Sequence, residues 1–221
     1  MSAKEYLVLG ALVIGLPAIY WVVLQWYKPN FEMQKNQMRK QLKTIPEIAV
    51  IILSEAALLK LWFEYQSNLL TDFMFALLYV VLIIMTILCV TDYWEKIVPN
   101  RILLLLTLVC FVIVGLQAIK DINIFIRMIP GMILGVIFCA ISFGAAYMLS
   151  HGSLGSGDVK LAFLLGIFLT GEYVVGTVFY GCLISALYSV FQLWRKKLTR
   201  KDEIPFVPFL YLGLIITCFV R

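Results

Sequence analysis

Two aspartates of this chain stand at the edges of apolar segments, and together they could carry out acid–base chemistry. Asp158 belongs to the turn 155–161, GSGDVKL, and Asp92 ends another apolar run just before the segment 93–100, YWEKIVPN. A carboxylate near hydrocarbon is energetically costly, so it usually marks a function. Two close aspartates that share a proton can activate water and donate to a carbonyl, which is the chemistry of peptide hydrolysis without a metal or a covalent intermediate.

The residues around the aspartates suit a site of this kind. Gly155 and Gly157 would permit a turn that larger residues resist and would let an extended substrate approach the backbone. Pro99 suits the first turn of the next helix. Lys160 could steady the charge of the nearby carboxylate, although a basic residue beside a membrane span is equally ordinary. Each aspartate alone also reads as a solvated loop residue, and a lone G-x-G is weak, so the hypothesis rests on the pair.

The elements that must position these residues are apolar helices. The chain is 62% hydrophobic and 14% charged, with a mean hydropathy of +0.96. About 20 apolar residues cross a hydrocarbon core of roughly 30 Å, and unbroken runs indicate helices rather than barrel strands. We predict an all-α, polytopic membrane bundle that forms one domain, 1–221, without internal repeats. Its eight expected segments are 6–26, 47–63, 69–90, 102–119, 128–149, 159–170, 173–194 and 204–220, of which the sixth is short for a span.

The basic residues predict how the bundle is oriented. Two loops are rich in them: 27–46 contains Lys28, Lys35, Arg39, Lys40 and Lys43, and the loop after 194 contains Arg195, Lys196, Lys197, Arg200 and Lys201. With eight crossings these loops share one side, which the positive-inside rule assigns to the cytoplasm. The same count places both aspartate loops there and both termini outside. Because the net charge of +5 gathers in such loops, nucleic-acid binding is not expected.

Other reactive side chains are few. The five cysteines lie inside apolar runs and form no C-x-x-C, so neither a zinc site nor a disulfide framework is expected, and no cofactor is implied. Glu55 lies within the second segment, where it could line a polar cavity or tune the aspartates, or it could pair with Lys60. His151, the single histidine, is either a substrate contact or an ordinary loop residue.

Three motifs together resemble the bacterial type IV prepilin peptidase family, the GxGD-type membrane aspartyl proteases. They are Asp92 with IVPN at 97–100, GSGDVKL at 155–161, and IPFVPFLYLG at 204–213. The resemblance implies that Asp92 and Asp158 are the catalytic pair, and that the glycines, Pro99 and Lys160 contact the substrate. The implied substrate is a prepilin or pseudopilin, cut at the cytoplasmic face after a short basic leader that ends in glycine.

One departure and two alternatives accompany this resemblance. Many family members carry paired C-x-x-C motifs in the first cytoplasmic loop, linked to zinc and to N-methylation, but 27–46 contains no cysteine. We therefore expect cleavage without methylation. A small proton- or cation-coupled transporter could use the same acids, although no inverted repeat is visible. Presenilin-like proteases also carry a GxGD, but the PFVPF ending at 205–209 fits the prepilin group better.

Overall fold

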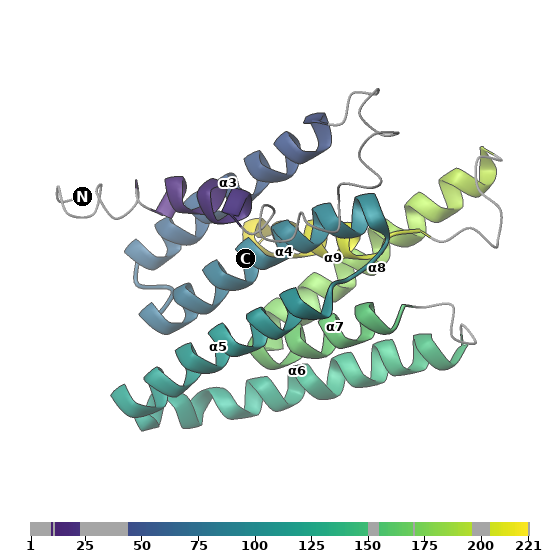
Figure 1. The fold of residues 1–221 in the computed structure, drawn as a ribbon. Helices are drawn as coiled ribbons and strands as arrows, with labels where there is room; N and C mark the ends of the chain where they lie inside the picture. The colour runs from purple at the N-terminus through teal and green to yellow at the C-terminus, as the bar shows by residue number, and fades with distance from the viewer. Residues whose placement is uncertain are drawn as a thin grey trace.

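The chain folds as a helical membrane bundle in the computed structural model, which describes residues 10, 12–22, 44–149, 155–169, 171–195 and 204–220 (Figure 1). No strand occurs among these residues. The helices are Leu12–Val22, α3 (Thr44–Gln66), α4 (Asp72–Glu95), α5 (Asn100–Lys120), α6 (Ile122–Leu149), α7 (Ser156–Phe168), α8 (Gly171–Trp194) and α9 (Val207–Val220). Each predicted apolar segment contains one of them, which confirms the predicted fold class. The basic loop 27–46 and His151 lie outside the described residues, apart from the start of α3.

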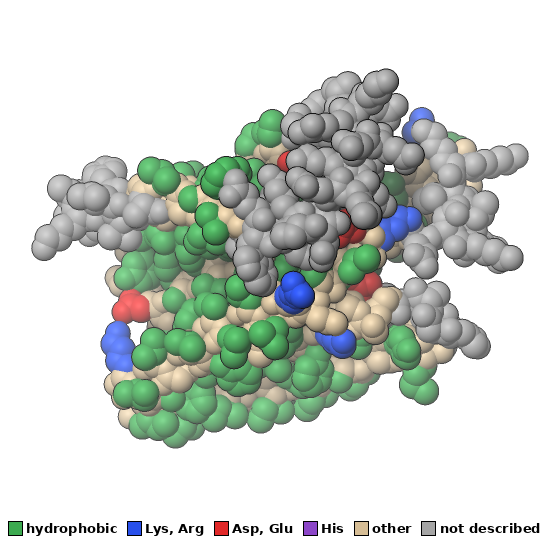
Figure 2. Space-filling view, viewed as in Figure 1, with side chains coloured by type: hydrophobic (Ala, Val, Ile, Leu, Met, Phe, Trp, Pro, Cys, Tyr) green, Lys and Arg blue, Asp and Glu red, His purple; other side chains and the backbone are tan. Residues whose placement is uncertain are grey.

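Among the described residues, four helices are long and apolar enough to cross a membrane by length and composition: α4, α5, α6 and α8. The sixth predicted segment, α7, has only 13 residues, as its short apolar run suggests. Of the most apolar window of α4, 72% is buried inside the bundle, against 11% for α6. α4 is therefore the central helix, whereas much of α6 faces outward. The face in Figure 2 is largely hydrophobic over its described part, as a surface in contact with lipid should be.

The turn between α4 and α5 places Asp92 at the end of the central helix. Lys96 adopts a left-handed conformation with φ of 54°, and its N–H donates to the Asp92 carbonyl at 2.9 Å. This contact closes the last turn of α4, because a left-handed residue commonly ends a helix. Pro99 then acts as the N-cap of α5, one position before the first turn in which we expected it.

The two short helices, α7 and α9, are fixed by close packing against longer ones. A Cβ on Gly166 of α7 would lie 2.8 Å from the Gly135 carbonyl oxygen of α6. A Cβ on Gly213 of α9 would lie 2.7 Å from the Gly181 amide nitrogen of α8. Small residues let helices approach closely where lipid supplies no hydrophobic drive for association. The glycines thus hold both short helices, which carry residues of the candidate site, at fixed positions.

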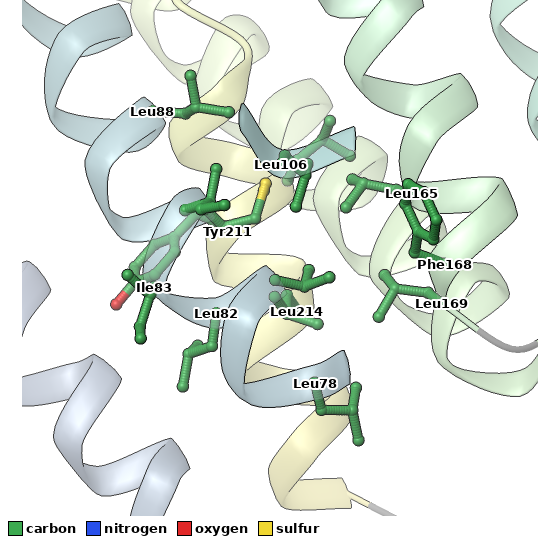
Figure 3. Close-up of a cluster of buried hydrophobic side chains, with 14 of the residues drawn as sticks. Leu78, Leu82, Ile83, Leu88, Leu106, Leu165, Phe168, Leu169, Tyr211 and Leu214 are labelled. Atoms are coloured by element: carbon green, nitrogen blue, oxygen red, sulfur yellow. The ribbon is translucent and has the colours of Figure 1, made fainter. Parts of the chain in front are cut away.

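The hydrophobic core lies where α4, α5, α7 and α9 meet (Figure 3). Leu82, Leu106, Leu165 and Leu214 come from these four helices, and each is at most 1% exposed. Four cysteines are buried in this apolar interior, but Cys182 is exposed, so it is not the core residue that its apolar context suggests; none of the five forms a disulfide. The end of α4 and the starts of α7 and α9 lie on the same side of the bundle (right in Figure 1).

Candidate active site

Asp92 is a buried carboxylate that is held by the start of another helix. Its side chain lies in the last turn of α4 and the residue is only 4% exposed. Its Oδ2 accepts a hydrogen bond from the backbone N–H of Val207, the first residue of α9, at 3.0 Å. The first N–H groups of a helix lack partners within the helix and lie at its positive end, so they favour an anion. The contact therefore gives the Asp92 carboxylate a backbone donor at the start of α9.

A buried polar cluster sets the position of α9. Tyr211 lies one turn after Val207, is 1% exposed, and donates its hydroxyl hydrogen to the Val50 carbonyl of α3 at 2.7 Å. Its hydroxyl is 2.6 Å from the Ser54 Oγ of α3, which in turn is 2.7 Å from the Thr86 Oγ1 of α4. These bonds join α3, α4 and α9. They fix the register that brings the Val207 amide to Asp92.

Asp158 occupies the first turn of α7, which is not one of the four candidate membrane spans. Its N–H donates to the Gly155 carbonyl at 3.0 Å, and its buried Oδ1 has no hydrogen-bond partner among the described residues. Burial, and then the negative charge of Asp92, raises the pKa of Asp158 to about 7. A helix N-terminus favours the ionised form, but loss of hydration dominates here. Asp158 therefore keeps its proton close to neutral pH.

The two carboxylates thus lie within electrostatic reach of each other and in different surroundings. Asp92 receives an amide hydrogen bond, whereas the buried Oδ1 of Asp158 receives none from a described residue. Pairs of acids whose surroundings separate their protonation states are typical of acid–base sites. One can take a proton from water while the other donates one to a carbonyl.

The glycines beside Asp158 are required for close packing and not for an unusual backbone angle. Gly155 has a φ of −58°, and a Cβ there would lie 3.0 Å from Oδ2 of Asp158. A Cβ on Gly157 would lie 2.8 Å from the Cβ of Val98, in the connection between α4 and α5. Neither glycine has a positive φ, so the turn does not depend on a backbone angle that larger residues resist. Gly157 instead lets the first turn of α7 approach the end of α4.

The other predicted site residues lie nearby with different contacts. Lys160 donates from Nζ to the Asn100 Oδ1 at 3.3 Å, so it links α7 to α5. Its described partner is thus an amide rather than Asp158, and its charge does not account for the state of that carboxylate. Pro99 is buried, and its carbonyl accepts the N–H groups of Ile102 and Leu103. Both residues border the turn that Gly157 packs against.

Glu55 does not form the pair with Lys60 that was one of the alternatives for it. Both carboxylate oxygens are buried without a hydrogen-bond partner among the described residues. Lys60 pairs with Glu64 at 3.1 Å, and not with Glu55. Within the described part of the chain, no group of three or more His, Cys, Asp or Glu side chains could hold a metal ion.

Val207 and the polar cluster around Tyr211 are the parts of the site that the sequence did not reveal. The motif 204–213 contains both residues, but the sequence gives no indication that a backbone amide in it contacts a carboxylate 115 positions earlier. Pro208, at the second position of α9, was the available signal, because proline favours the first turn of a helix. Pro208 thus predicts where α9 starts, but not that the first N–H group of α9 contacts Asp92.

Comparisons with known proteins agree with this arrangement. The sequence profile of the type IV leader peptidase family matches residues 79–190, which include both aspartates. A protein of Bacillus subtilis (strain 168) named prepilin leader peptidase/N-methyltransferase is 27% identical over 133 residues, which cover 60% of this chain and 51% of that protein. The chain thus matches about half the length of this curated relative, and no solved structure matches. The chain belongs to the type IV leader peptidase family.

Proposed function

We propose that the chain is a membrane aspartyl endopeptidase that removes the leader peptide of type IV prepilins or pseudopilins. The observation that carries this proposal is a pair of acids at one end of the bundle: Asp92, which is buried, and Asp158, which is half-buried with its Oδ1 buried. Family membership and the name of the Bacillus relative support it. The transporter alternative has less support, because the paired acids lie at one end of the described bundle rather than along a path through it.

The geometry supports a mechanism with a distinct role for each acid. Ionised Asp92, held by the Val207 amide, takes a proton from water, and the oxygen of that water attacks the scissile carbonyl carbon. Protonated Asp158 donates its proton to the carbonyl oxygen. A tetrahedral diol forms. When the diol collapses, its hydroxyl proton returns to Asp158, the proton on Asp92 passes to the leaving nitrogen, and the C–N bond breaks.

We place this site at the cytoplasmic face, with both termini outside. The support is the sequence: the basic loops 27–46 and 195–203 join the same ends of the helices as the two aspartate turns. The orientation can be tested with Glu95→Cys in a chain that lacks the native cysteines. An impermeant thiol reagent added to intact cells should leave this cysteine unlabelled, and labelling from outside would reverse the orientation.

We further propose that the chain cleaves without methylating the new N-terminus, because 27–46 contains no cysteine. Purified protein should cut a prepilin peptide in detergent, without an ion gradient and in the presence of EDTA. Mass spectrometry should find an unmodified amine even when S-adenosylmethionine is added. Absence of cleavage by the native protein would contradict the proposed function, whereas a methylated product would contradict only this last part.

A further inference from the structure

An apolar cavity of about 240 Å³ lies beside Asp92 and has no assigned role. It lies between the first turns of α3, the last turns of α4 and the start of α9, and it opens at the surface, where Leu53 and Tyr93 are 36% and 49% exposed. Its walls include Glu47, Ala49 and Leu53 of α3, Cys89 and Tyr93 of α4, and Pro208 and Leu212 of α9. The accessible lining is almost entirely apolar, since the hydroxyl of bordering Tyr211 is bonded to Val50 and Ser54. The cavity thus offers a dry surface at the end of the bundle that holds the acids.

The cavity is continuous with the residues that hold Asp92. Tyr93 follows Asp92 directly, and Cys89 lies one turn before Tyr93 on α4. Pro208 follows Val207, whose N–H bonds to the Asp92 carboxylate. The cavity wall and the carboxylate are therefore built from the same turns of α4 and α9. An extended peptide advances about 3.4 Å per residue, so one whose carbonyl meets Asp92 carries its neighbouring side chains close to the cavity.

The size and lining of the cavity limit what it can bind. Sites for small molecules usually measure about 300–1,000 Å³, so this cavity suits one side chain better than a whole ligand. Apart from Glu47, the wall offers a charged or amide group little compensation for its lost hydration. An aliphatic or aromatic side chain would instead gain free energy by burial.

We propose that this cavity is a specificity subsite that binds one large apolar side chain of the precursor, next to the bond that is cut. The inference rests on the proposed peptidase function and deepens it. The residues that determine the size of the subsite are then Ala49, Leu53 and Leu212, which lie outside the carboxylate pair. Binding there would hold the neighbouring carbonyl at Asp92.

Substitutions that change the cavity volume test this subsite. Ala49→Phe fills the cavity and Leu53→Ala enlarges it. The control, Ile48→Phe, adds the same ring at a neighbouring residue that is 53% exposed and does not line the cavity. Each protein is assayed on prepilin peptides that carry Ala, Leu, Phe or Trp on either side of the cut bond. The ratio of kcat/KM values between two peptides is independent of how much protein is folded.

We expect Ala49→Phe to lower kcat/KM for the Phe peptide relative to the Ala peptide by about tenfold or more, because one methylene in an apolar pocket already changes discrimination by roughly 10–200-fold. The effect should appear at one of the two varied positions. Leu53→Ala should shift the preference toward Trp by a similar factor, and Ile48→Phe should keep the native ratios. If both cavity variants kept the native kcat/KM ratios, the proposed subsite would be wrong. Cleavage by the native chain would still support the proposed peptidase function. Absence of cleavage by the native chain would overturn both.

A binding measurement tests the subsite without catalysis. Asp158→Asn protein is mixed with a prepilin peptide that carries a photoreactive benzophenone side chain at the position identified above. Mass spectrometry should place the cross-links on α3 near Leu53 and on α9 near Leu212, and Ala49→Phe should reduce them. Cross-links confined to other helices would overturn the proposal.

Discussion

At one end of the bundle Asp72 forms an ion pair with Lys120 at 3.4 Å, and both side chains are about 70% exposed. At the other end Asp92 is 4% exposed, and the buried Oδ1 of Asp158 has no hydrogen-bond partner among the described residues. An exposed ion pair contributes little to stability and little to chemistry. Acids with buried carboxylate oxygens lower stability unless they are compensated, so two of them within electrostatic reach of each other indicate a functional site.

Cavity volume alone would favour the opposite end. A cavity of about 890 Å³ lies beside Asp72 and Lys120, whereas the cavity beside Asp92 measures about 240 Å³. The larger cavity is bordered by solvated charges, since the side chains of Asp72 and Lys120 are about 70% exposed. Burial of the acids, and not cavity size, therefore distinguishes the two ends. The following substitutions test that distinction.

The largest effect should come from the buried acids themselves. Asp92→Asn and Asp158→Asn should each lower kcat for prepilin cleavage by about 10²–10⁴-fold, because an amide cannot exchange the proton. The matched control is Asp72→Asn at the exposed end, which removes the same charge and should leave kcat unchanged. Comparable losses at both ends would show that the distinction is false.

A smaller loss should follow from moving Asp158 relative to Asp92. Gly157→Val should slow cleavage about a hundredfold, because its side chain would displace α7 from Val98 and a shift near 1 Å has that effect. Ser156→Ala, at an exposed neighbouring position, is the control. Adding Val98→Gly should restore part of the lost rate. Full activity of Gly157→Val at matched amounts of inserted protein would show that this contact does not position the carboxylate.

The pH dependence should reveal which acid carries the proton. Because the pKa of Asp158 is raised to about 7 and its protonated form donates, kcat should fall about tenfold per pH unit above neutrality. The raised pKa also means that the folded state binds this proton more tightly than the unfolded state. Its contribution to the free energy of unfolding is complete below about pH 4 and is lost as the pH rises through about 7. Thermal unfolding in detergent should show that loss in native protein but not in Asp158→Asn.

The smallest effect should come from the polar cluster that positions α9. Tyr211→Phe removes the hydroxyl that contacts Val50 and Ser54, and should lower the free energy of unfolding by about 1–3 kcal/mol. A less well-placed Val207 amide should also lower kcat while KM changes little. Tyr188→Phe, at an exposed tyrosine bonded to Gln192, is the control. Equal effects of the two substitutions would show that the Tyr211 hydroxyl does not position α9.

The sequence predicted the helices better than the contacts between them. Unbroken apolar runs located every helix, for example α5 at Asn100–Lys120 against the predicted 102–119, because a span must be continuous and apolar. The bond from Val207 to Asp92 joins residues 115 positions apart. It depends on how α9 packs against α4, which no local pattern encodes.

The roles of the small and charged neighbours were also beyond local reasoning. Gly155 and Gly157 were recognisable as important, but their reason is steric contact with Asp158 and Val98, which requires the tertiary structure. For Lys160 the sequence left open a role at Asp158 or an ordinary place beside a membrane span, and the structure shows a bond to Asn100 across the interface between α7 and α5. Helix periodicity places Lys160 near the site, but it does not indicate which residue its side chain contacts.

The central claim is that Asp92 and Asp158 act as one electrostatic pair. An infrared titration of the purified protein in detergent tests it most directly, with Asp158→Asn used to identify the carboxyl band. The band of protonated Asp158 should disappear as the pH rises through about 7, and it should disappear at lower pH in Asp92→Asn, where the neighbouring charge is removed. A band that titrates at the same pH with and without Asp92 would contradict the account, because the two carboxylates would then act independently.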